Sequence, residues 1–194
     1  MYQDNIVLCG ASAYEQKFYF NQDFNALPDH VKKELQIMCV LFTEDVGGIL
    51  RLEFDETLIT GIPDLEFHIA AWTLMSDKLL QLQDYENVYL YPVVSEEKIK
   101  ELFDLCDIYL DINHYNEVYD STNRAVNNSM AVFAFENTVH RRDICLKKNI
   151  FETTDCDKMI GRIKETMYEQ SIYQDLIKEQ YKKLYIAAAG MFEE

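Results

Sequence analysis

The chain has 194 residues, of which 48% are hydrophobic, and it contains only 3 proline and 6 glycine residues. Such a composition can bury a core and is not typical of a disordered segment. The 18 Lys and Arg residues against 34 Asp and Glu residues give a formal net charge of −16. Because binding to phosphate backbones and anionic lipids depends on Lys and Arg, this charge argues against nucleic acid and membrane surfaces as partners.

The cysteines and the amino terminus indicate the compartment. The 5 cysteines are widely spaced and form no CxxC pair or Cys/His cluster, so we expect no metal site. Scattered thiols are typical of a reducing environment. The opening MYQDNIVLCG lacks the basic and apolar regions of a signal peptide, and no window approaches the roughly 20 apolar residues that cross a membrane. We therefore expect a cytoplasmic protein without a membrane span.

Residues 1–57 are predicted to form a small α+β module in the order β-β-α-β. The expected elements are strands at Asn5–Cys9, Lys17–Phe20 and Ile49–Phe54 and a helix that Pro28 opens and that continues to Phe42. Between Phe54 and Leu65 the sequence TLITGIP is too short and too apolar for a crossover helix. We therefore assign the strand at 49–54 to this module or to an antiparallel edge.

Residues 58–156 have a different hydrophobic pattern, in which short apolar runs alternate with helical patterns of about ten residues. The expected strands are Leu65–Ala70, Asn87–Val94, Asp107–Ile112 and Met130–Phe135, and the expected helices are Thr73–Leu82, Glu96–Cys106 and Glu117–Asn127. This alternation predicts right-handed βαβ units and an open, mainly parallel, Rossmann-like α/β sheet. Residues 157–194 are predicted to form a C-terminal helical segment, broken near Ser171, whose apolar stripe packs on the domain or, alternatively, meets a partner chain.

Ligands of open parallel sheets bind beyond the carboxyl ends of the strands. At the end of the third predicted strand, this rule selects His114, Asn116 and Glu117 as candidate binding residues. The alternative is that Asn116 and Asp120 only cap the following helix. Phosphate groups favour such helix starts because free N–H groups point toward them.

The loop after the fourth predicted strand carries a second candidate group, Glu136, Asn137 and Thr138. A carboxylate there can accept hydrogen bonds from sugar hydroxyls, and the two polar side chains can donate to phosphate. The basic run Arg141, Arg142, Lys147 and Lys148 follows, either as a solvated face or as a neutraliser of a diphosphate. The chain has no G-x-G-x-x-G, P-loop or G-x-S-x-G motif. His68, within an apolar strand, is predicted to be a core histidine.

Four stretches carry a resemblance to a known family: PDLEFHIAAWTLMSDKL, NVYLYPVV, CDIYLDINHYNEV and AVFAFENTVHRRD. Residues 56–190 resemble the C-terminal half of GT-B glycosyltransferases of the accessory-Sec type, which glycosylate serine-rich adhesins. That group includes a catalytic subunit and its non-catalytic stabilising partner. The resemblance implies a site for a UDP-sugar, typically UDP-N-acetylglucosamine, as the donor, with no further cofactor.

The chain departs from that family in three places. Retaining members carry a Glu-x7-Glu motif, but Glu117 is followed at that spacing by Ala125, which favours the non-catalytic partner type. Residues 1–57 do not resemble an acceptor-binding half. They resemble instead a small protein family of Gram-positive bacteria that has no established function. The chain therefore looks like a fusion of two unrelated pieces. The strand that begins the glycosyltransferase half is then expected to be missing.

Three functional hypotheses remain. The first is a glycosyltransferase-like domain that binds a UDP-sugar, with Lys78 or Arg141 near the diphosphate, and that does not catalyse transfer alone. The second is a non-catalytic stabilising subunit of a protein O-glycosyltransferase complex, or a homodimer, that docks through the C-terminal helix. The third, which we favour least, is a transferase whose cleft is completed by a second copy of the chain.

Overall fold

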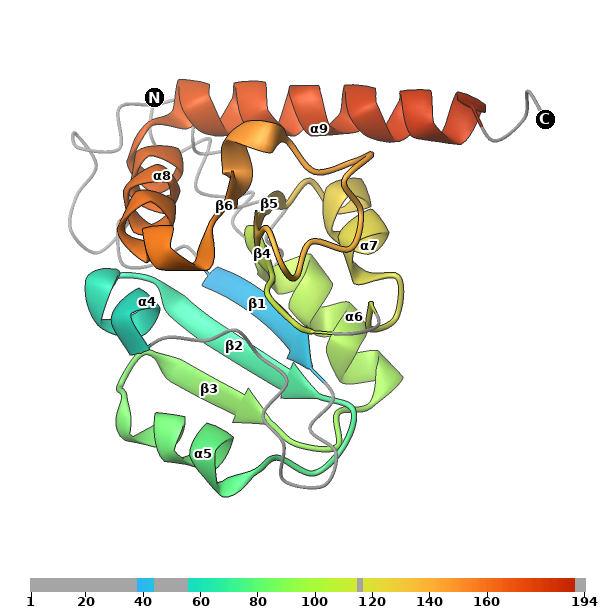
Figure 1. The fold of residues 1–194 in the computed structure, drawn as a ribbon. Coiled ribbons are helices and arrows are strands. Elements are labelled where there is room, and N and C mark those ends of the chain that lie inside the picture. The colour runs from blue at the N-terminus through green and yellow to red at the C-terminus, as the bar shows by residue number, and fades with distance from the viewer. Residues whose placement is uncertain (1–37, 44–55, 115–116, 191–194) are drawn as a thin grey trace, which may run out of the picture.

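The computed structural model describes residues 38–43 as backbone, together with residues 56–114 and 117–190. In these ranges, a six-stranded parallel sheet has the strand order β3-β2-β1-β4-β5-β6 (Figure 1). The strands are β1 Met38–Thr43, β2 Glu66–Ala71, β3 Val88–Tyr91, β4 Ile108–Asp111, β5 Ala131–Phe135 and β6 Ile150–Phe151. This is the order of a doubly wound Rossmann-like fold, so the predicted open parallel α/β sheet is confirmed.

Strand β1 corrects the sequence prediction. All six of its residues pair in parallel with Glu66–Ala71, and Cys39 and Val40 pair with β4 on the other side. The helix predicted to continue to Phe42 is therefore wrong over Met38–Thr43. A short apolar run such as MCVLFT satisfies helical and strand periodicity equally well, so spacing alone could not decide between them.

The strand expected to be missing is thus present, at the centre of the sheet. It lies within residues 1–57, so the sheet uses residues that the prediction assigned to a separate module. The other elements predicted there, the strands at 5–9, 17–20 and 49–54 and the helix before residue 38, lie outside the described residues. The rest of the predicted domain division stays a prediction.

The crossover between β1 and β2 contains a helix that the sequence argument had excluded. Helix α4, Glu56–Gly61, forms within the segment judged too short, with Leu58 and Ile59 buried. The apolar side of this helix faces α8, where a Cβ on Gly61 would lie 2.6 Å from Ile160 Cδ1. The apolar character of TLITGIP therefore reflects burial of this short helix.

The remaining predicted elements are confirmed in order, with shifted ends. The helices are α5 Asp77–Leu80, α6 Glu96–Leu105, α7 Ser121–Asn127, α8 Cys156–Tyr168 and α9 Gln170–Gly190, and short 3₁₀ turns are η3 Gln81–Asp84, η4 Lys147–Asn149 and η5 Thr153–Asp155. Helix α6 begins where Ser95 Oγ accepts a hydrogen bond from the N–H of Lys98 at 3.2 Å, an N-cap that satisfies a free donor. The break in the C-terminal helical segment falls at Glu169.

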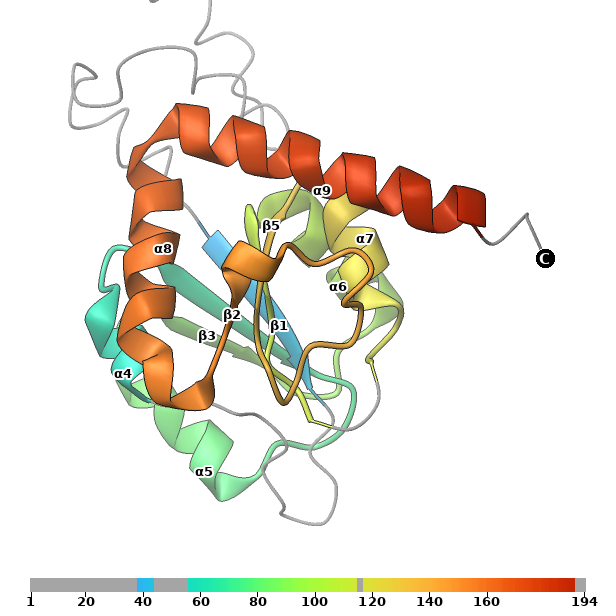
Figure 2. The same ribbon diagram turned by 45° about the horizontal axis from the view of Figure 1, so that its top comes forward.

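Helices cover both faces of the sheet (Figure 2). On one face, Phe67 and Phe133 join a core cluster with Met159 of α8 and Leu176 of α9. On the other face, the neighbouring Val132 joins a cluster with residues of α6 and α7. Because successive side chains of a strand point to opposite faces, a sheet covered on both sides needs continuous apolar strands, and all five residues of β5 are buried.

Helix α9 supports the predicted packing of the C-terminal segment over its first half. The buried side chain of Gln180 accepts a hydrogen bond from Val132 N at 2.9 Å and donates to Met130 O at 2.8 Å. The carboxyl-terminal part runs past the rest of the domain (Figure 1), and Tyr185 and Ile186 are 79% and 60% exposed. Among the described helices, none is long and apolar enough to cross a membrane.

Candidate functional site

The strand order fixes where a ligand can bind. Strands β1 and β4 are neighbours in the sheet, and the chain winds away from them in opposite directions. At such a switch point the loops beyond the carboxyl ends diverge and leave a crevice, which is where open α/β sheets bind their ligands. The loop that follows β4 therefore borders the candidate site and the loop that follows β5 lies one strand away from it, and their role in binding stays a prediction.

Asp111, the last residue of β4, organises this edge of the sheet. Its side chain is fully buried, and its two carboxylate oxygens accept hydrogen bonds from His140 Nδ1 at 2.6 Å and from the His140 backbone N–H at 2.8 Å. Its carbonyl oxygen accepts a third from Thr138 Oγ1 at 2.8 Å. A buried carboxylate is stable only with such partners. Asp111 thus fixes the loop after β5 to the end of β4.

Sequence reasoning missed this pair. Asp111 and His140 lie at the ends of the two candidate segments, 111–117 and 136–140, but neither was selected as a binding residue and their contact was not predicted. A usable signal was present, because a carboxylate in the otherwise apolar run IYLDI must find a partner when the strand is buried on both faces. The nearest polar loop at the same sheet edge is the one that contains His140.

Glu117 and its neighbours lie in the loop between β4 and α7. Glu117 Oε1 accepts a hydrogen bond from the backbone N–H of Thr122 at 2.7 Å, so this carboxylate caps α7. Asp120 occupies the N-cap position with φ 52 and makes no side-chain cap bond. His114 is half-buried in the same loop, and Asn116 lies outside the described residues. Side-chain capping by Asp120 is therefore wrong, capping by Asn116 lies outside the described residues, and Glu117 caps the helix instead.

The second candidate group, after β5, divides between surface and interior. Glu136 and Asn137 are exposed, whereas Thr138 is buried against Asp111. Arg142 Nη2 donates to the carboxylate of Glu136 at 2.5 Å and to its carbonyl oxygen at 2.6 Å. The hydrogen bond from Arg142 holds the pKa of the Glu136 carboxyl below its ordinary value. Glu136 therefore presents an ionised carboxylate, held by Arg142, at the start of the loop after β5.

The predicted basic patch is largely paired with acidic side chains. Arg141 donates to both carboxylate oxygens of Asp143, at 3.0 and 2.6 Å, which raises the pKa of its guanidinium. The carboxylates of Glu117 and Asp120 raise that pKa further. Lys148 pairs with Glu179 at 2.8 Å. A diphosphate at this edge would compete with these carboxylates for Arg141, so its predicted role stays a prediction.

Lys78 is exposed in α5, on the crossover between β2 and β3. The strand order puts that crossover on the opposite side of β1 from the loops of Glu117 and Glu136. The predicted residues therefore fall into two groups that flank the switch point. Only a ligand that extends along the sheet edge could contact both groups.

Two further predicted positions have structural roles. Ala125 of α7, which stands at the Glu-x7-Glu spacing after Glu117, is fully buried in a core cluster with residues of α6. His68 is buried, as predicted, with Nδ1 2.8 Å from the hydroxyl of Tyr91. Burial, and secondarily the charge of Lys98, lowers the pKa of His68 to about 4. Among the described residues no group of three His, Cys, Asp or Glu side chains could hold a metal ion.

Comparison with known proteins agrees with this architecture. The family model described as the GftB/GlyA-F C-terminal domain matches residues 51–180, which is most of the sheet and its helices. The chain belongs to the GftB/GlyA-F C-terminal domain family. The match begins after β1, so this strand lies before the matched region although it is central to the sheet.

Curated proteins are similar to this chain over part of their own length. The chain is 42% identical over 142 residues to the UDP-N-acetylglucosamine--peptide N-acetylglucosaminyltransferase stabilizing protein GtfB of Streptococcus agalactiae, covering 69% of this chain and 32% of the relative. It is 37% identical over 119 residues to glycosyltransferase GlyB of Streptococcus pneumoniae, covering 61% of this chain and 29% of the relative. The chain thus spans about a third of the length of the curated relatives it matches.

Solved structures give the same fold for the GftB/GlyA-F C-terminal domain. A structure of the GtfA/B complex bound to UDP and GlcNAc has a TM-score of 0.68 at 25% identity, covering 85% of this chain and 40% of the matched chain. TarM shares the fold, with a TM-score of 0.61 at 14% identity over 77% of this chain and 32% of its own. The domain is therefore glycosyltransferase-like, with GT-B glycosyltransferases as structural neighbours.

Proposed function

We propose that this domain binds a UDP-sugar at the carboxyl edge of its sheet and does not transfer the sugar on its own. The observation that carries the proposal is the junction of Asp111 with Thr138 and His140. It orders the loop of Glu136, which follows the strand next to the switch point of a doubly wound sheet, the usual ligand position in this fold. Binding loops need such prior ordering, because a loop ordered only on binding weakens affinity.

The chemistry of the flanking residues fits a nucleotide sugar. Glu136 is ionised and can accept hydrogen bonds from sugar or ribose hydroxyls, and Asn137 can both donate and accept. Arg141 or Lys78, which lie on the two flanks, can neutralise phosphate charge. The likeness to a GtfA/B complex solved with UDP and GlcNAc supports the same class of ligand.

Catalysis by this domain alone is not part of the proposal. Sugar transfer requires donor and acceptor to be held together with water excluded. The buried Ala125 supplies no carboxylate at the position of the family's second glutamate. We infer that this domain contributes donor binding or stabilisation to a larger glycosyltransferase assembly in the cytoplasm, either the remainder of a longer chain or a partner subunit.

Calorimetric titration with UDP and UDP-N-acetylglucosamine tests the proposal. We expect saturable binding, tighter for the nucleotide sugar, and loss of most of that affinity in Glu136→Ala. The matched control is Glu165→Ala, because Glu165 is also an exposed glutamate paired with an arginine, Arg162, at 2.9 Å, but on α8. Absence of UDP binding by the folded wild-type protein would sink the proposal. Equal affinities of the two variants would instead remove Glu136 from the site.

A second candidate function rests on the exposed end of α9. Tyr181, Tyr185 and Ile186 line an apolar groove of about 690 Å³ together with Asn127 of α7. Large exposed aromatic and aliphatic side chains that lie together are typical of protein interfaces. Relatives of this chain are named as stabilizing proteins of a glycosyltransferase. The second candidate function is therefore that of a stabilising subunit. It would dock through α9 onto a glycosyltransferase or onto a second copy of itself.

Light scattering with and without a co-expressed glycosyltransferase subunit tests this second function. We expect a complex or a dimer that dissociates in Ile186→Glu. Lys178→Glu is the control, because Lys178 lies on the same helix, is 73% exposed and is not part of the groove. A wild-type protein that remains monomeric and does not associate with the transferase would contradict the docking function and leave donor binding unaffected.

A further inference from the structure

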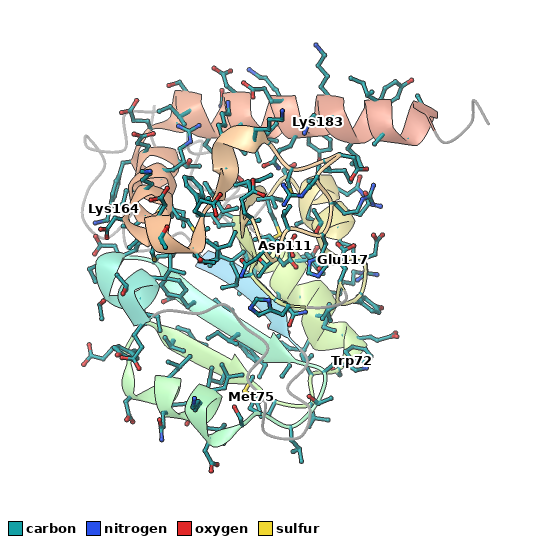
Figure 3. The ribbon with its side chains drawn as sticks, viewed as in Figure 1. Trp72, Met75, Asp111, Glu117, Lys164 and Lys183 are labelled. Carbon is teal, nitrogen blue, oxygen red and sulfur yellow. The ribbon has the colours of Figure 1, made fainter. Side chains whose placement is uncertain are left out.

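Trp72 begins a stack of rings at the carboxyl edge of the sheet. It directly follows Ala71, the last residue of β2, and its side chain remains 40% exposed. Its indole lies on the ring of Tyr119, with centroids 5.6 Å apart and planes inclined by 29°. Figure 3 shows Trp72 at the periphery of the molecule, on the same side as Glu117.

The stack continues into the core and is held rigidly. The guanidinium of Arg124 lies 4.0 Å above the ring centroid of Tyr119 and 5.7 Å from that of Phe103, which is buried in α6. The loop of Trp72 is also tied to the next loop, because Val93 N donates to Thr73 O at 3.1 Å and Val94 N donates to Ala71 O at 2.9 Å. An exposed ring on such a fixed base loses little conformational entropy when a ligand stacks on it.

The distance between the stack and the switch point indicates which part of a ligand could reach Trp72. One strand, β1, separates β2 from β4, so at about 4.8 Å per strand the loops of Trp72 and Asp111 begin roughly 10 Å apart. A nucleoside diphosphate whose phosphates lie at the switch point reaches such a distance with its base. On the opposite flank, beyond β5, the exposed residues at positions 136, 137, 142 and 143 include no aromatic ring.

We propose that Trp72 is the stacking surface for the nucleobase of the nucleotide sugar, with Tyr119 and Arg124 as the residues that position its ring. This inference rests on the proposed UDP-sugar site and gives the ligand a direction: base toward β2 and β3, diphosphate toward β4, sugar toward the loop of Glu136. The alternative is that the stack only ties together the loops after β2 and β4. That alternative predicts a change in stability without a change in affinity.

The fluorescence of Trp72 can report ligand binding at this position, because the chain contains a single tryptophan. We expect UDP to quench or shift the tryptophan fluorescence of the wild-type protein, whereas inorganic pyrophosphate, which lacks the base, leaves the spectrum unchanged. Trp72→Ala should weaken UDP binding about ten-fold or more, the usual effect of removing a base-stacking ring. Trp72→Phe should keep most of the affinity, because it retains a ring on Tyr119.

The control is Tyr185→Ala, which removes an exposed ring from α9 and should leave UDP affinity unchanged. Wild-type protein that binds UDP calorimetrically without a fluorescence change, and with equal affinity in Trp72→Ala, overturns the stacking role but not the UDP-sugar site. Wild-type protein that binds no UDP overturns both. If Trp72→Ala does not fold, the wild-type fluorescence response to UDP against pyrophosphate decides alone, because it requires no variant.

Discussion

Asp111 and His140 are 29 positions apart in the sequence, yet the carboxylate of one and the imidazole Nδ1 of the other lie 2.6 Å apart. The pairing of β4 with β5 brings them together, because Asp111 stands opposite Ala134 in the sheet register. Asp111 is fully buried and the His140 side chain is 11% exposed. The two residues therefore form a nearly dry contact between the two loops that flank the candidate site.

The loss of stability on replacing His140 should depend on whether the new side chain keeps a hydrogen-bond donor. His140→Ala leaves a buried carboxylate without its side-chain partner, so we expect a loss of about 3 kcal/mol in the free energy of unfolding. His140→Asn places an amide N–H near the position of Nδ1 and should lose only about 1 kcal/mol. Urea unfolding measures both variants, and equal losses would mean that the Asp111 contact contributes little.

His68 should make the fold sensitive to acid. Its pKa is lowered from 6.5 to about 4 in the folded state, first by burial and then by Lys98. Between those values the unfolded chain binds a proton that the folded chain does not. Stability therefore falls as the pH drops from 6.5 toward 4, by about 3 kcal/mol for this residue.

The variant His68→Phe keeps an aromatic ring between Tyr89 and Tyr91 and removes the titration. We expect its unfolding free energy to depend less on pH over that window than that of the wild type. Parallel pH profiles for wild type and His68→Phe would show that His68 titrates normally.

Replacing Val93 by glycine should stabilise the fold. Its φ is 50, in the left-handed region that is unfavourable for a β-branched residue, and 60% of the residue is exposed, so little burial is at stake. We expect Val93→Gly to raise the free energy of unfolding by about 1 kcal/mol. Leu74→Gly, at an exposed position without positive φ, should instead lower it. Thermal unfolding of both variants tests the contrast.

Two glycines should respond in opposite ways to alanine. A Cβ on Gly161, inside α8, would meet no atom within 4 Å, so Gly161→Ala should stabilise by about 1 kcal/mol through helix propensity. A Cβ on Gly61 would lie 2.6 Å from Ile160 Cδ1, so Gly61→Ala requires that side chain to move and should not stabilise. Equal gains in melting temperature would show that α4 and α8 pack less closely than described.

The sequence predicted four of the strands well because each is an apolar run closed by polar turns. The sheet-edge rule then selected the loops of Glu117 and Glu136 without any structural knowledge. Strand β1 was mistaken for a helix end because Met38–Thr43 is short, apolar and preceded by a helical pattern. Its pairing with β4 depends on residues far along the chain, so no local window contained the information that identifies it.

The site was predicted less completely, for the same reason. Residue types indicated which loops to propose for binding, but not which side chains neutralise one another. The pairing of Arg142 with Glu136 and of Lys148 with Glu179 changes an apparent basic patch into a set of ion pairs. The junction of Asp111 with His140 depends on the register of two strands, which an apolar pattern does not specify.

The central place of β1 has a consequence for synthesis. This strand leaves the ribosome before every other strand described, and β2 pairs with only one of its edges. Its second neighbour, β4, emerges after two further crossovers. Until then the nascent chain carries a hydrophobic strand with an open edge, the kind of surface on which chains aggregate. A chain that stalls before Ile108 would therefore depend on chaperones for its solubility.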